Sequence, residues 1–165
     1  MRYDLKLIAA CDMHGGIGRD GELLVRISED MKRFKSLTKG ETVVYGRKTL
    51  DTFPGKKPLP KRNNIVLSRN RELFLEGATV VHSIDKLMEL LDSMDGVIWV
   101  IGGAQIYEQL LPYCNEAYIT RLYGDFDADA FIEDFSSLEE WRLIEASEIF
   151  EDIIQYRFEL YSRNG

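Results

Sequence analysis

Asp30 is the first residue whose type and position could support proton chemistry. It lies in the first turn of a predicted amphipathic helix that begins at Ser28, where Ser28 can cap the helix and Met31 and Phe34 continue the apolar face. A carboxylate that faces an apolar cleft has a raised pKa and can take part in acid–base catalysis. The helix dipole also stabilises an acid in the first turn, so this motif alone indicates an acid at the protein surface.

Cationic and hydroxyl side chains follow two successive predicted strands. Gly46-Arg47-Lys48-Thr49 comes directly after a strand at 42–45, and Ser68-Arg69 follows a strand at 64–67. A guanidinium, an ammonium and a hydroxyl that converge are well suited to bind a phosphate monoester. Arg62 follows a rigid turn at Pro60 and could bind a carboxylate.

Two glycine motifs are candidates for binding a phosphate. In Ile101-Gly102-Gly103-Ala104 a buried strand leads directly into a helix, whose first N–H groups can hold a phosphate; close helix–strand packing without a ligand is the alternative. Gly16–Gly21 formally matches the dinucleotide-binding fingerprint, but that mechanism needs a helix to open within the turn. The next predicted helix begins only at Ser28, so we interpret 16–21 as part of a mobile, glycine-rich loop.

The charge of the chain is unevenly distributed. The net charge of −7 argues against nucleic acid as a partner. The segment from Gly46 to Arg71 nevertheless contains one acid, Asp51, and eight basic residues: Arg47, Lys48, Lys56, Lys57, Lys61, Arg62, Arg69 and Arg71. Such a segment indicates either a local site for an anionic ligand or a solvated basic loop, and charge alone does not choose between them.

The elements that must position these residues alternate between strands and helices. Strands are predicted at 3–11, 42–45, 64–67, 79–81, 97–101 and 116–122, helices from 28, at 47–53, at 83–94 and up to 110, a loop at 12–27, and a hairpin of 143–150 with 153–161. This pattern predicts an α/β fold: a mostly parallel twisted sheet with a C-terminal antiparallel hairpin and helices on both faces. Ligands bind such sheets at the carboxyl ends of the strands, here near Asp12, Gly46, Ser68 and Gly102.

Length and composition set outer bounds on the class of protein. The 165 residues are predicted to form one domain, 1–165, with 45% hydrophobic and 30% charged residues, which argues against disorder. No apolar run suits a membrane span and no signal peptide is visible. Cys11 and Cys114 are too few for a disulfide framework or a metal site and are expected to be buried, so we expect a cytoplasmic protein.

Seven segments in one order resemble those of a known family. They are Ile8-Ala9-Ala10, Ile17-Gly18, Asp30 with Phe34-Lys35, Gly46-Arg47-Lys48-Thr49, Leu59-Pro60 with Arg62–Ser68, Ile101-Gly102-Gly103 with Ile106-Tyr107, and Tyr118-Ile119-Thr120. No single segment is specific, but together they cover essentially the whole chain, which is similar to dihydrofolate reductases of the bacterial type. The resemblance implies NADPH-dependent reduction of 7,8-dihydrofolate to 5,6,7,8-tetrahydrofolate.

The resemblance implies that Asp30 and Thr120 are the catalytic residues. Asp30 would accept hydrogen bonds from the 2-amino group and a ring nitrogen of the pterin, and would support protonation of N5 by a water while a hydride reaches C6. Thr120 would support the same hydrogen-bond network. Phe34 would lie near the pterin and benzoyl rings, and Arg62 would bind the glutamate α-carboxylate. The substrate-binding set is Ile8, Ala10, Val25, Met31, Phe34, Phe53, Leu59, Arg62 and Ile101.

The resemblance also implies a site for NADPH, and no metal. Arg47, Lys48, Ser68 and Arg69 would surround the 2′-phosphate, and Thr49 with the turn Gly102–Gln105 would hold the pyrophosphate. The cofactor-binding set is Ala10, Ile17, Gly18, Gly46, Arg47, Lys48, Thr49, Leu67, Ser68, Arg69, Gly102, Gly103, Ala104, Gln105 and Ile106. In the family the Gly-Gly bond is cis, and a mobile loop, here 15–24, covers the nicotinamide. We expect a monomer whose partner is the small-molecule substrate.

The chain departs from the family pattern at three places. Leu24-Val25 replaces Pro-Trp, Lys48 replaces a common His, and Ala128-Asp129-Ala130 replaces Gly-Asp-Thr. The valine side chain has no N–H, whereas the family's tryptophan has an indole N–H that helps to fix a water near the carboxylate that binds the pterin. We therefore expect a working enzyme with weaker affinity at the pterin site. Two alternatives stay open here: a reductase of another pteridine or of a pyrimidine with the same fold, and a catalytically silent protein that binds NADP(H) or folate.

Overall fold

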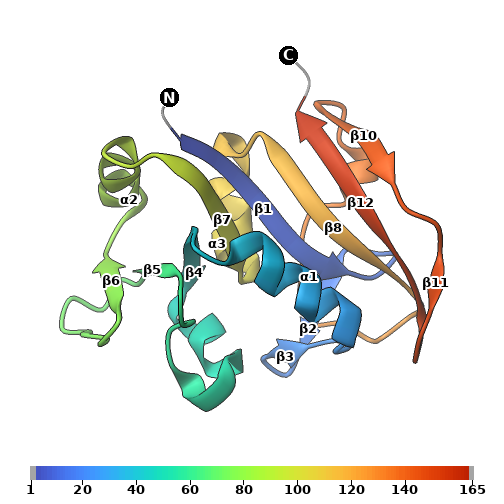
Figure 1. Ribbon diagram of the computed structural model, residues 1–165, viewed down its shortest axis with the longest axis horizontal. Helices are drawn as coiled ribbons and strands as arrows, with labels where there is room; N and C mark the ends of the chain where they lie inside the picture. Colours follow the sequence, from blue (N-terminus) through green and yellow to red (C-terminus); the bar gives the residue numbers. More distant parts are fainter. Residues whose placement is uncertain (1–2, 164–165) are drawn as a thin grey trace.

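The computed structural model describes residues 3–163, which build a nine-stranded main sheet (Figure 1). Its strands are β1 (Tyr3–Cys11), β4 (Thr42–Gly46), β5 (Asn63–Leu67), β6 (Ala78–Val81), β7 (Gly96–Gly102), β8 (Glu116–Tyr123), β10 (Trp141–Ala146), β11 (Phe150–Glu151) and β12 (Gln155–Arg163). They lie in the order β10-β12-β8-β1-β7-β4-β5-β6, with β11 paired to β12. The pairs from β8 to β6 are parallel, and β12 runs antiparallel to β8 and β10. The predicted mostly parallel sheet with an antiparallel C-terminal edge is confirmed.

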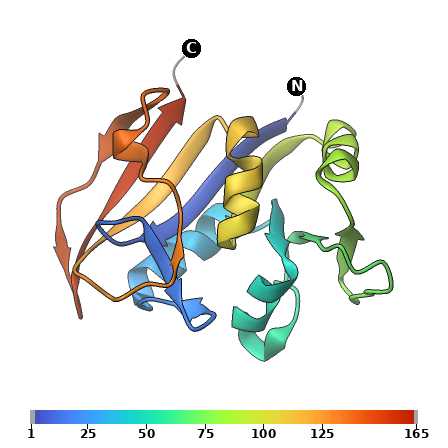
Figure 2. The same cartoon turned by 180° about the vertical axis from the view of Figure 1, so that it is seen from behind.

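Helices cover both faces of this sheet, as predicted. Helix α1 (Ser28–Thr38) crosses the face seen in Figure 1, and α3 (Ala104–Leu110) crosses the opposite face seen in Figure 2; α2 (Ile84–Asp92) lies at the β6 end. Successive side chains along β1 point to opposite faces of the sheet. Leu7 packs in the cluster with α3, and Ile8 packs in the cluster with the α1 side chains. Among the described residues, no helix is long and apolar enough to cross a membrane.

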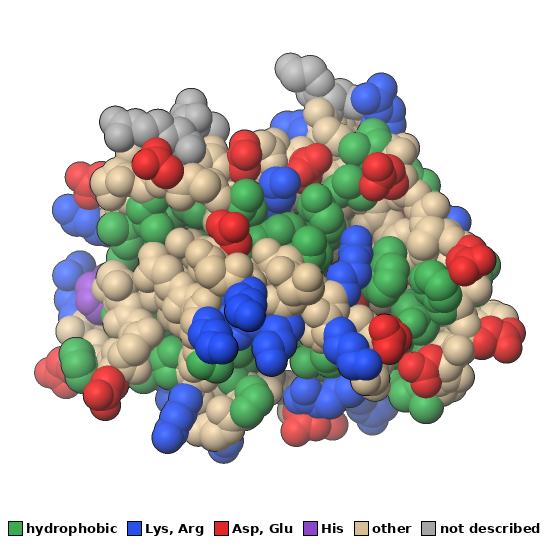
Figure 3. All heavy atoms as spheres, viewed as in Figure 1, with side chains coloured by type: hydrophobic (Ala, Val, Ile, Leu, Met, Phe, Trp, Pro, Cys, Tyr) green, Lys and Arg blue, Asp and Glu red, His purple; other side chains and the backbone are tan. Residues whose placement is uncertain are grey.

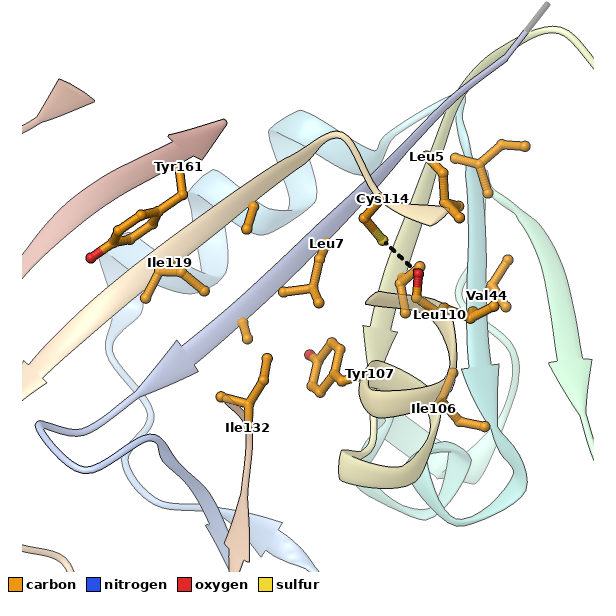
Figure 4. Close-up of a cluster of buried hydrophobic side chains, with 14 of the residues drawn as sticks. Leu5, Leu7, Val44, Ile106, Tyr107, Leu110, Cys114, Ile119, Ile132 and Tyr161 are labelled. Atoms are coloured by element: carbon orange, nitrogen blue, oxygen red, sulfur yellow. Dashed lines mark hydrogen bonds between the residues drawn. The ribbon is translucent and has the colours of Figure 1, made fainter. Parts of the chain in front are cut away.

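The larger core cluster lies under α3 (Figure 4). Tyr107 points from α3 toward Leu7 of β1, and Leu110 lies next to Cys114; these side chains are buried. Cys114 hydrogen-bonds the Leu110 carbonyl at 3.3 Å. Both cysteines are free and buried, as expected, and burial raises the pKa of each thiol to about 12.

The segment 12–27 differs from the predicted loop. It contains β2 (Gly16–Arg19) and β3 (Glu22–Leu23), which form a second sheet with β9 (Ala130–Phe131). The N–H of Ile132 donates to the carbonyl of Gly15 at 2.8 Å, and the N–H of Asp129 donates to the carbonyl of Gly18 at 2.9 Å. These strands are held by a segment more than a hundred residues away, so no local pattern indicated them. Because β2 continues as a strand and no helix opens at Gly16–Gly21, the rejection of a dinucleotide turn is confirmed.

The cap of one helix, the type of a second helix and the continuity of one strand also differ from the prediction. The N-cap of α1 is the buried Ile27, without a side-chain bond, so the prediction that Ser28 caps the helix was wrong. The predicted helix at 47–53 is a 3-10 turn, η1 (Arg47–Thr52), followed by η2 (Pro54–Lys56). Two further 3-10 turns are η3 (Leu111–Tyr113) and η4 (Phe135–Ser137). The first strand of the predicted hairpin is split into β10 and β11, because the Ser147 hydroxyl accepts the N–H of Phe158 at 2.9 Å.

A buried ion network fastens the main sheet to the turn that leads into β2. The guanidinium of Arg121 donates from Nε to Glu159 at 3.1 Å and from Nη1 to the carbonyl of Asp12 at 3.1 Å. Glu159 also accepts hydrogen bonds from Arg157 and from the Tyr161 hydroxyl, at 2.8 and 2.9 Å. The side chains of Arg121 and Glu159 are only 6% and 3% exposed, so protein groups take the place of water around both charges, with Asp134 a second carboxylate 3.6 Å from Arg121.

Replacing Glu159 with alanine should destabilise the protein strongly. The change removes the closer of two carboxylates from a buried guanidinium and leaves it only Asp134, at 3.6 Å. Breaking a buried ion pair costs about 3–5 kcal/mol of the free energy of unfolding. Urea unfolding of Glu159→Ala against the unmodified protein measures this loss. The control is Glu89→Ala, which breaks an exposed pair with Lys86 and should change stability by no more than about 1 kcal/mol. Equal, small losses in both variants would show that the network is not important for stability.

Candidate active site

A cavity of about 380 Å³ lies at the carboxyl ends of β1, β7 and β8. Its wall comes from α1, β2, η1 and the beginning of α3. The predicted site residues that line it are Ile8, Ala10, Ile17, Gly18, Asp30, Met31, Phe34, Lys48, Thr49, Phe53, Leu59, Ile101, Gly102, Gly103, Ala104 and Thr120. Most of these side chains are apolar, so the cavity suits a flat, largely apolar ligand that a few polar groups orient.

Asp30 is the carboxylate that this cavity takes out of water. It lines the cavity from α1, and the hydroxyl of Thr120 on β8 donates to its Oδ1 at 2.5 Å. Thr120 is held beside Ala10 by the parallel register of β1 and β8. Burial raises the pKa of the Asp30 carboxyl above its ordinary value, although the hydrogen bond from Thr120 and the positive charge of Arg33 act in the opposite direction. A carboxyl with a raised pKa can take part in acid–base chemistry at a higher pH than an exposed aspartate can.

Tyr107 is a second polar group in the cavity wall, and sequence reasoning did not place it in the site. Its hydroxyl donates to the backbone carbonyl of Ile8 at 2.7 Å, and burial raises the pKa of the phenol. The bond joins α3 to β1 directly below the cavity. A signal was present, because Tyr107 stands one helical turn after Gly103 and so returns to the same side of α3.

The parallel register brings the predicted phosphate-binding segments together. Gly46 of β4 pairs with Leu67 of β5, so the chain leaves the two strands side by side at Arg47 and Ser68. On the other side of β4, Tyr45 pairs with Gly102 of β7. Cations, hydroxyls and the Gly-Gly turn therefore share one edge of the sheet, although they are far apart in the sequence.

The turn between β7 and α3 brings backbone close to the cavity. Its Gly102–Gly103 peptide is cis, as the resemblance implied, and Gly102 has a φ of +136°, which side-chain-bearing residues rarely adopt. A Cβ built on Gly102 would lie 3.4 Å from the Thr49 hydroxyl oxygen, so a side chain there would crowd the space next to Thr49. Gly103 then precedes α3, whose first N–H groups are free of side-chain caps and open to an acceptor.

The remaining predicted residues do not line the cavity: Val25, Gly46, Arg47, Arg62, Leu67, Ser68, Arg69, Gln105 and Ile106. Val25 packs beside the buried cluster of Ile27, Leu122 and Tyr156, so it is turned toward β8 and β12. Arg62 lies next to the cavity residue Leu59, where its Nε donates to Thr38 at 3.1 Å and its Nη1 to the Pro60 carbonyl at 3.0 Å.

Positive charge gathers on one face of the protein despite the net charge of −7. On the face that carries α1, Lys and Arg side chains cluster in the centre of the view, over α1 and the segments below it (Figure 3). Arg47 is exposed and pairs with Asp51 at 3.2 Å. Such a field attracts an anionic ligand to this face of an acidic protein.

Several further wall residues were missed by sequence reasoning, among them Arg19, Glu22, Leu23, Arg26, Thr52, Pro54, Asp129 and Ala130. Asp129 and Ala130 reach the cavity because β9 pairs with β2, and the Asp129 carboxylate accepts the N–H of Asp20 at 2.9 Å. A two-residue strand has no periodicity, so the sequence carried no signal for this contact. Arg26 and Thr52 are linked at 3.5 Å across the mouth between α1 and η1, a contact that only the tertiary fold creates.

Comparison with known proteins gives a consistent result. A family model described as dihydrofolate reductase matches residues 4–163. The chain is 45% identical over 117 residues to a dihydrofolate reductase of Mycobacterium leprae (strain TN), covering 70% of each chain. It is 31% identical over 162 residues to that of Staphylococcus haemolyticus, covering 96% of this chain and 95% of the relative. It is 30% identical over 164 residues to that of Bacillus subtilis (strain 168), covering 98% and 95%.

A solved structure supports the same conclusion at the level of the fold. A dihydrofolate reductase from Enterococcus faecalis, complexed with NADP(H) and RAB-propyl, superimposes with a TM-score of 0.89 at 32% identity. The similarity covers 98% of this chain and 97% of that one. Sequence and fold therefore agree over almost the whole length.

Proposed function

Since the chain belongs to the dihydrofolate reductase family and is an NADPH-dependent oxidoreductase that reduces dihydrofolate, we propose that Asp30 orients the pterin in this cavity and supports its protonation by a water. One observation carries this assignment. Asp30 is held by Thr120 inside an apolar-walled cavity, where burial raises its pKa. The carboxylate is thus placed where a polar edge of a flat ring can reach it, and where its charge is not dissipated by water.

For the substrate, we propose two zones in the cavity. In the inner zone Asp30 accepts hydrogen bonds from the 2-amino group and a ring nitrogen of the pterin, while Ile8 and Ile101 offer backbone carbonyls. In the outer zone Phe34, Phe53 and Leu59 pack on the rings, since they line the cavity toward η1 and η2. Arg62 stands beside Leu59 at the rim and binds the glutamate α-carboxylate, with its fork already oriented by Thr38 and Pro60.

The residues at the sheet edge fit NADPH. Arg47 and Ser68, placed side by side by the β4–β5 register, suit the 2′-phosphate together with Lys48 and Arg69. Thr49 and the turn Gly102–Gln105 suit the pyrophosphate, because the cavity wall there is backbone and hydroxyl with no bulky side chain. When bound, NADPH supplies the hydride that C6 of the pterin receives. Ala10, Ile17 and Gly18 line the neighbouring wall and keep water away from that position.

The proton that completes the reduction is the task of this chain's own residues. The Asp30 carboxylate lowers the electrostatic cost of a protonated pterin, so a water can protonate N5 beside it. Thr120 donates to Oδ1 and thereby keeps Oδ2 free for the ring. Exclusion of bulk water by Phe34, Met31 and the β2 strand strengthens both interactions.

We also infer that the enzyme acts as a monomer in the cytoplasm and does not bind nucleic acid. The two free, buried thiols suit a reducing compartment, and the acidic net charge opposes nucleic-acid binding. Light scattering of the purified protein tests the oligomeric state, with one chain per particle as the expected result.

The direct test of the function is NADPH oxidation followed by absorbance, with and without dihydrofolate. We expect oxidation that depends on dihydrofolate, and tetrahydrofolate as the product. A purified, folded protein that binds both ligands without turnover would contradict the proposed chemistry. Turnover of a pyrimidine or of a pteridine other than dihydrofolate, in preference to dihydrofolate, would contradict the proposed substrate.

Replacing Asp30 with asparagine should leave cofactor affinity and fold intact and lower kcat with dihydrofolate by about 10²–10⁴-fold. An amide cannot supply the negative charge that favours a protonated pterin. The remaining rate should rise as the pH falls, because substrate protonated in solution then bypasses the missing charge. Steady-state kinetics of Asp30→Asn across the pH range measure both effects. Turnover at neutral pH close to that of the unmodified enzyme would refute the role of Asp30.

Replacing Arg47 with alanine should weaken NADPH selectively. A charge-assisted contact to a phosphate is worth about 1.5–3 kcal/mol, so the KM for NADPH should rise about tenfold or more. The KM for NADH, which lacks the 2′-phosphate, should change little. The matched control is Lys32→Ala, which removes an exposed cation that pairs with Glu29 on α1. Equal losses with both cofactors in Arg47→Ala would show that Arg47 acts on the fold and not on the phosphate.

A further inference from the structure

Arg33 stands one helical turn after Asp30, on the same side of α1. Its guanidinium carbon lies 4.2 Å from the centroid of the Phe158 ring and 5.6 Å from that of the Tyr118 ring. Phe158 is the register partner of Thr120, the residue that hydrogen-bonds Asp30. The cation is therefore held over β8 and β12, and β8 also holds the Asp30 carboxylate through Thr120.

The rings fix the guanidinium without neutralising it. Stacking on an aromatic face holds a cation in place while leaving its charge intact. Within residues 3–163, no carboxylate forms a salt bridge with Arg33, in contrast to Arg121 and Arg157, which share Glu159. Its charge thus remains available to act on the nearest desolvated anion, which is Asp30.

The other titratable groups around Asp30 are Tyr107 from α3, Tyr156 from β12, Glu29 from the same turn, and Arg19, Glu22, Arg26, Lys48 and Asp129 around the cavity. The two phenols have raised pKa values and are uncharged at neutral pH. The pKa of Asp30 is raised by burial and lowered by the hydrogen bond from Thr120 and by the charge of Arg33. Arg33 is thus the cation that opposes the effect of burial.

We propose that Arg33 is a positioning charge for the reaction, which from its place over Phe158 and Tyr118 favours the carboxylate form of Asp30 and so sets the pH range of turnover. This inference rests on the proposed role of Asp30. A buried carboxyl without such a cation would be neutral over a wider pH range, and a neutral acid cannot stabilise the protonated pterin. The position of Arg33, outside the cavity wall, lets it act without blocking the ligand.

The test is the pH dependence of kcat/KM for dihydrofolate at saturating NADPH, which reports the pKa of groups in the enzyme that binds the substrate. Arg33→Met removes the charge and keeps an unbranched side chain over the rings, whereas Arg33→Lys keeps the charge. The limb of the profile that depends on Asp30 should move to higher pH in Arg33→Met, because the cation that favours the carboxylate is lost. It should return toward its original position in Arg33→Lys.

The control variant is Lys32→Met, which removes an exposed cation that pairs with Glu29 on the same helix and should leave the profile unchanged. Arg33→Gln replaces Arg33→Met if thermal unfolding shows that the methionine variant is not folded. An unmoved limb in the uncharged variant, or a loss by one factor at every pH, would overturn the inference. Asp30→Asn separates this failure from a failure of the proposed function: if Asp30→Asn keeps both the limb and the rate, the role of Asp30 is itself wrong.

Discussion

The hydrogen bond from Thr120 to Asp30 joins a helix to a strand inside an apolar cavity, and much of the remaining structure serves to keep that contact dry and in place. A carboxyl that is removed from water has a raised pKa, so small changes in its surroundings alter its charge. The two residues of this hydrogen bond come from different elements. Thr120 is fixed by the sheet register, and α1 is fixed by packing over β7 and β8. A shift of α1 by a fraction of a turn would break the bond.

The same sheet also brings together the segments that we propose to bind NADPH, by a different means. Parallel strands end at one edge, so short segments after β4, β5 and β7 become neighbours without any contact between them in sequence. The buried pair of Arg121 and Glu159 extends this order to the other side of the sheet. It holds the carbonyl of Asp12, from which the chain turns into β2, and β2 lines the cavity at Ile17 and Gly18. Sheet stability and the shape of the site therefore depend on common residues.

The mostly parallel sheet, its antiparallel C-terminal edge and the helices on both faces followed from periodicity, and most cavity residues followed from the resemblance that the order of short motifs carries. The order of the strands was not predicted. What the sequence did not indicate depends on tertiary contacts. The pairing of β2 with β9 joins segments more than a hundred residues apart, and the split of the hairpin depends on the hydroxyl of Ser147. The N-cap of α1 is Ile27, a buried residue whose side chain makes no capping hydrogen bond. Val25, expected to face the pterin, packs on the cluster of Ile27, Leu122 and Tyr156, of which the last two lie on the distant strands β8 and β12.

The most direct test of this account is the titration of the Asp30 carboxyl itself in the free enzyme. Carbon-13 NMR of protein labelled at aspartate carboxyl carbons, with the signal assigned by its loss in Asp30→Asn, follows this single group. Desolvation by the cavity predicts a pKa above the ordinary aspartate value of 3.8. A pKa at or below that value would mean that water or a stronger partner solvates Asp30, and would contradict the account.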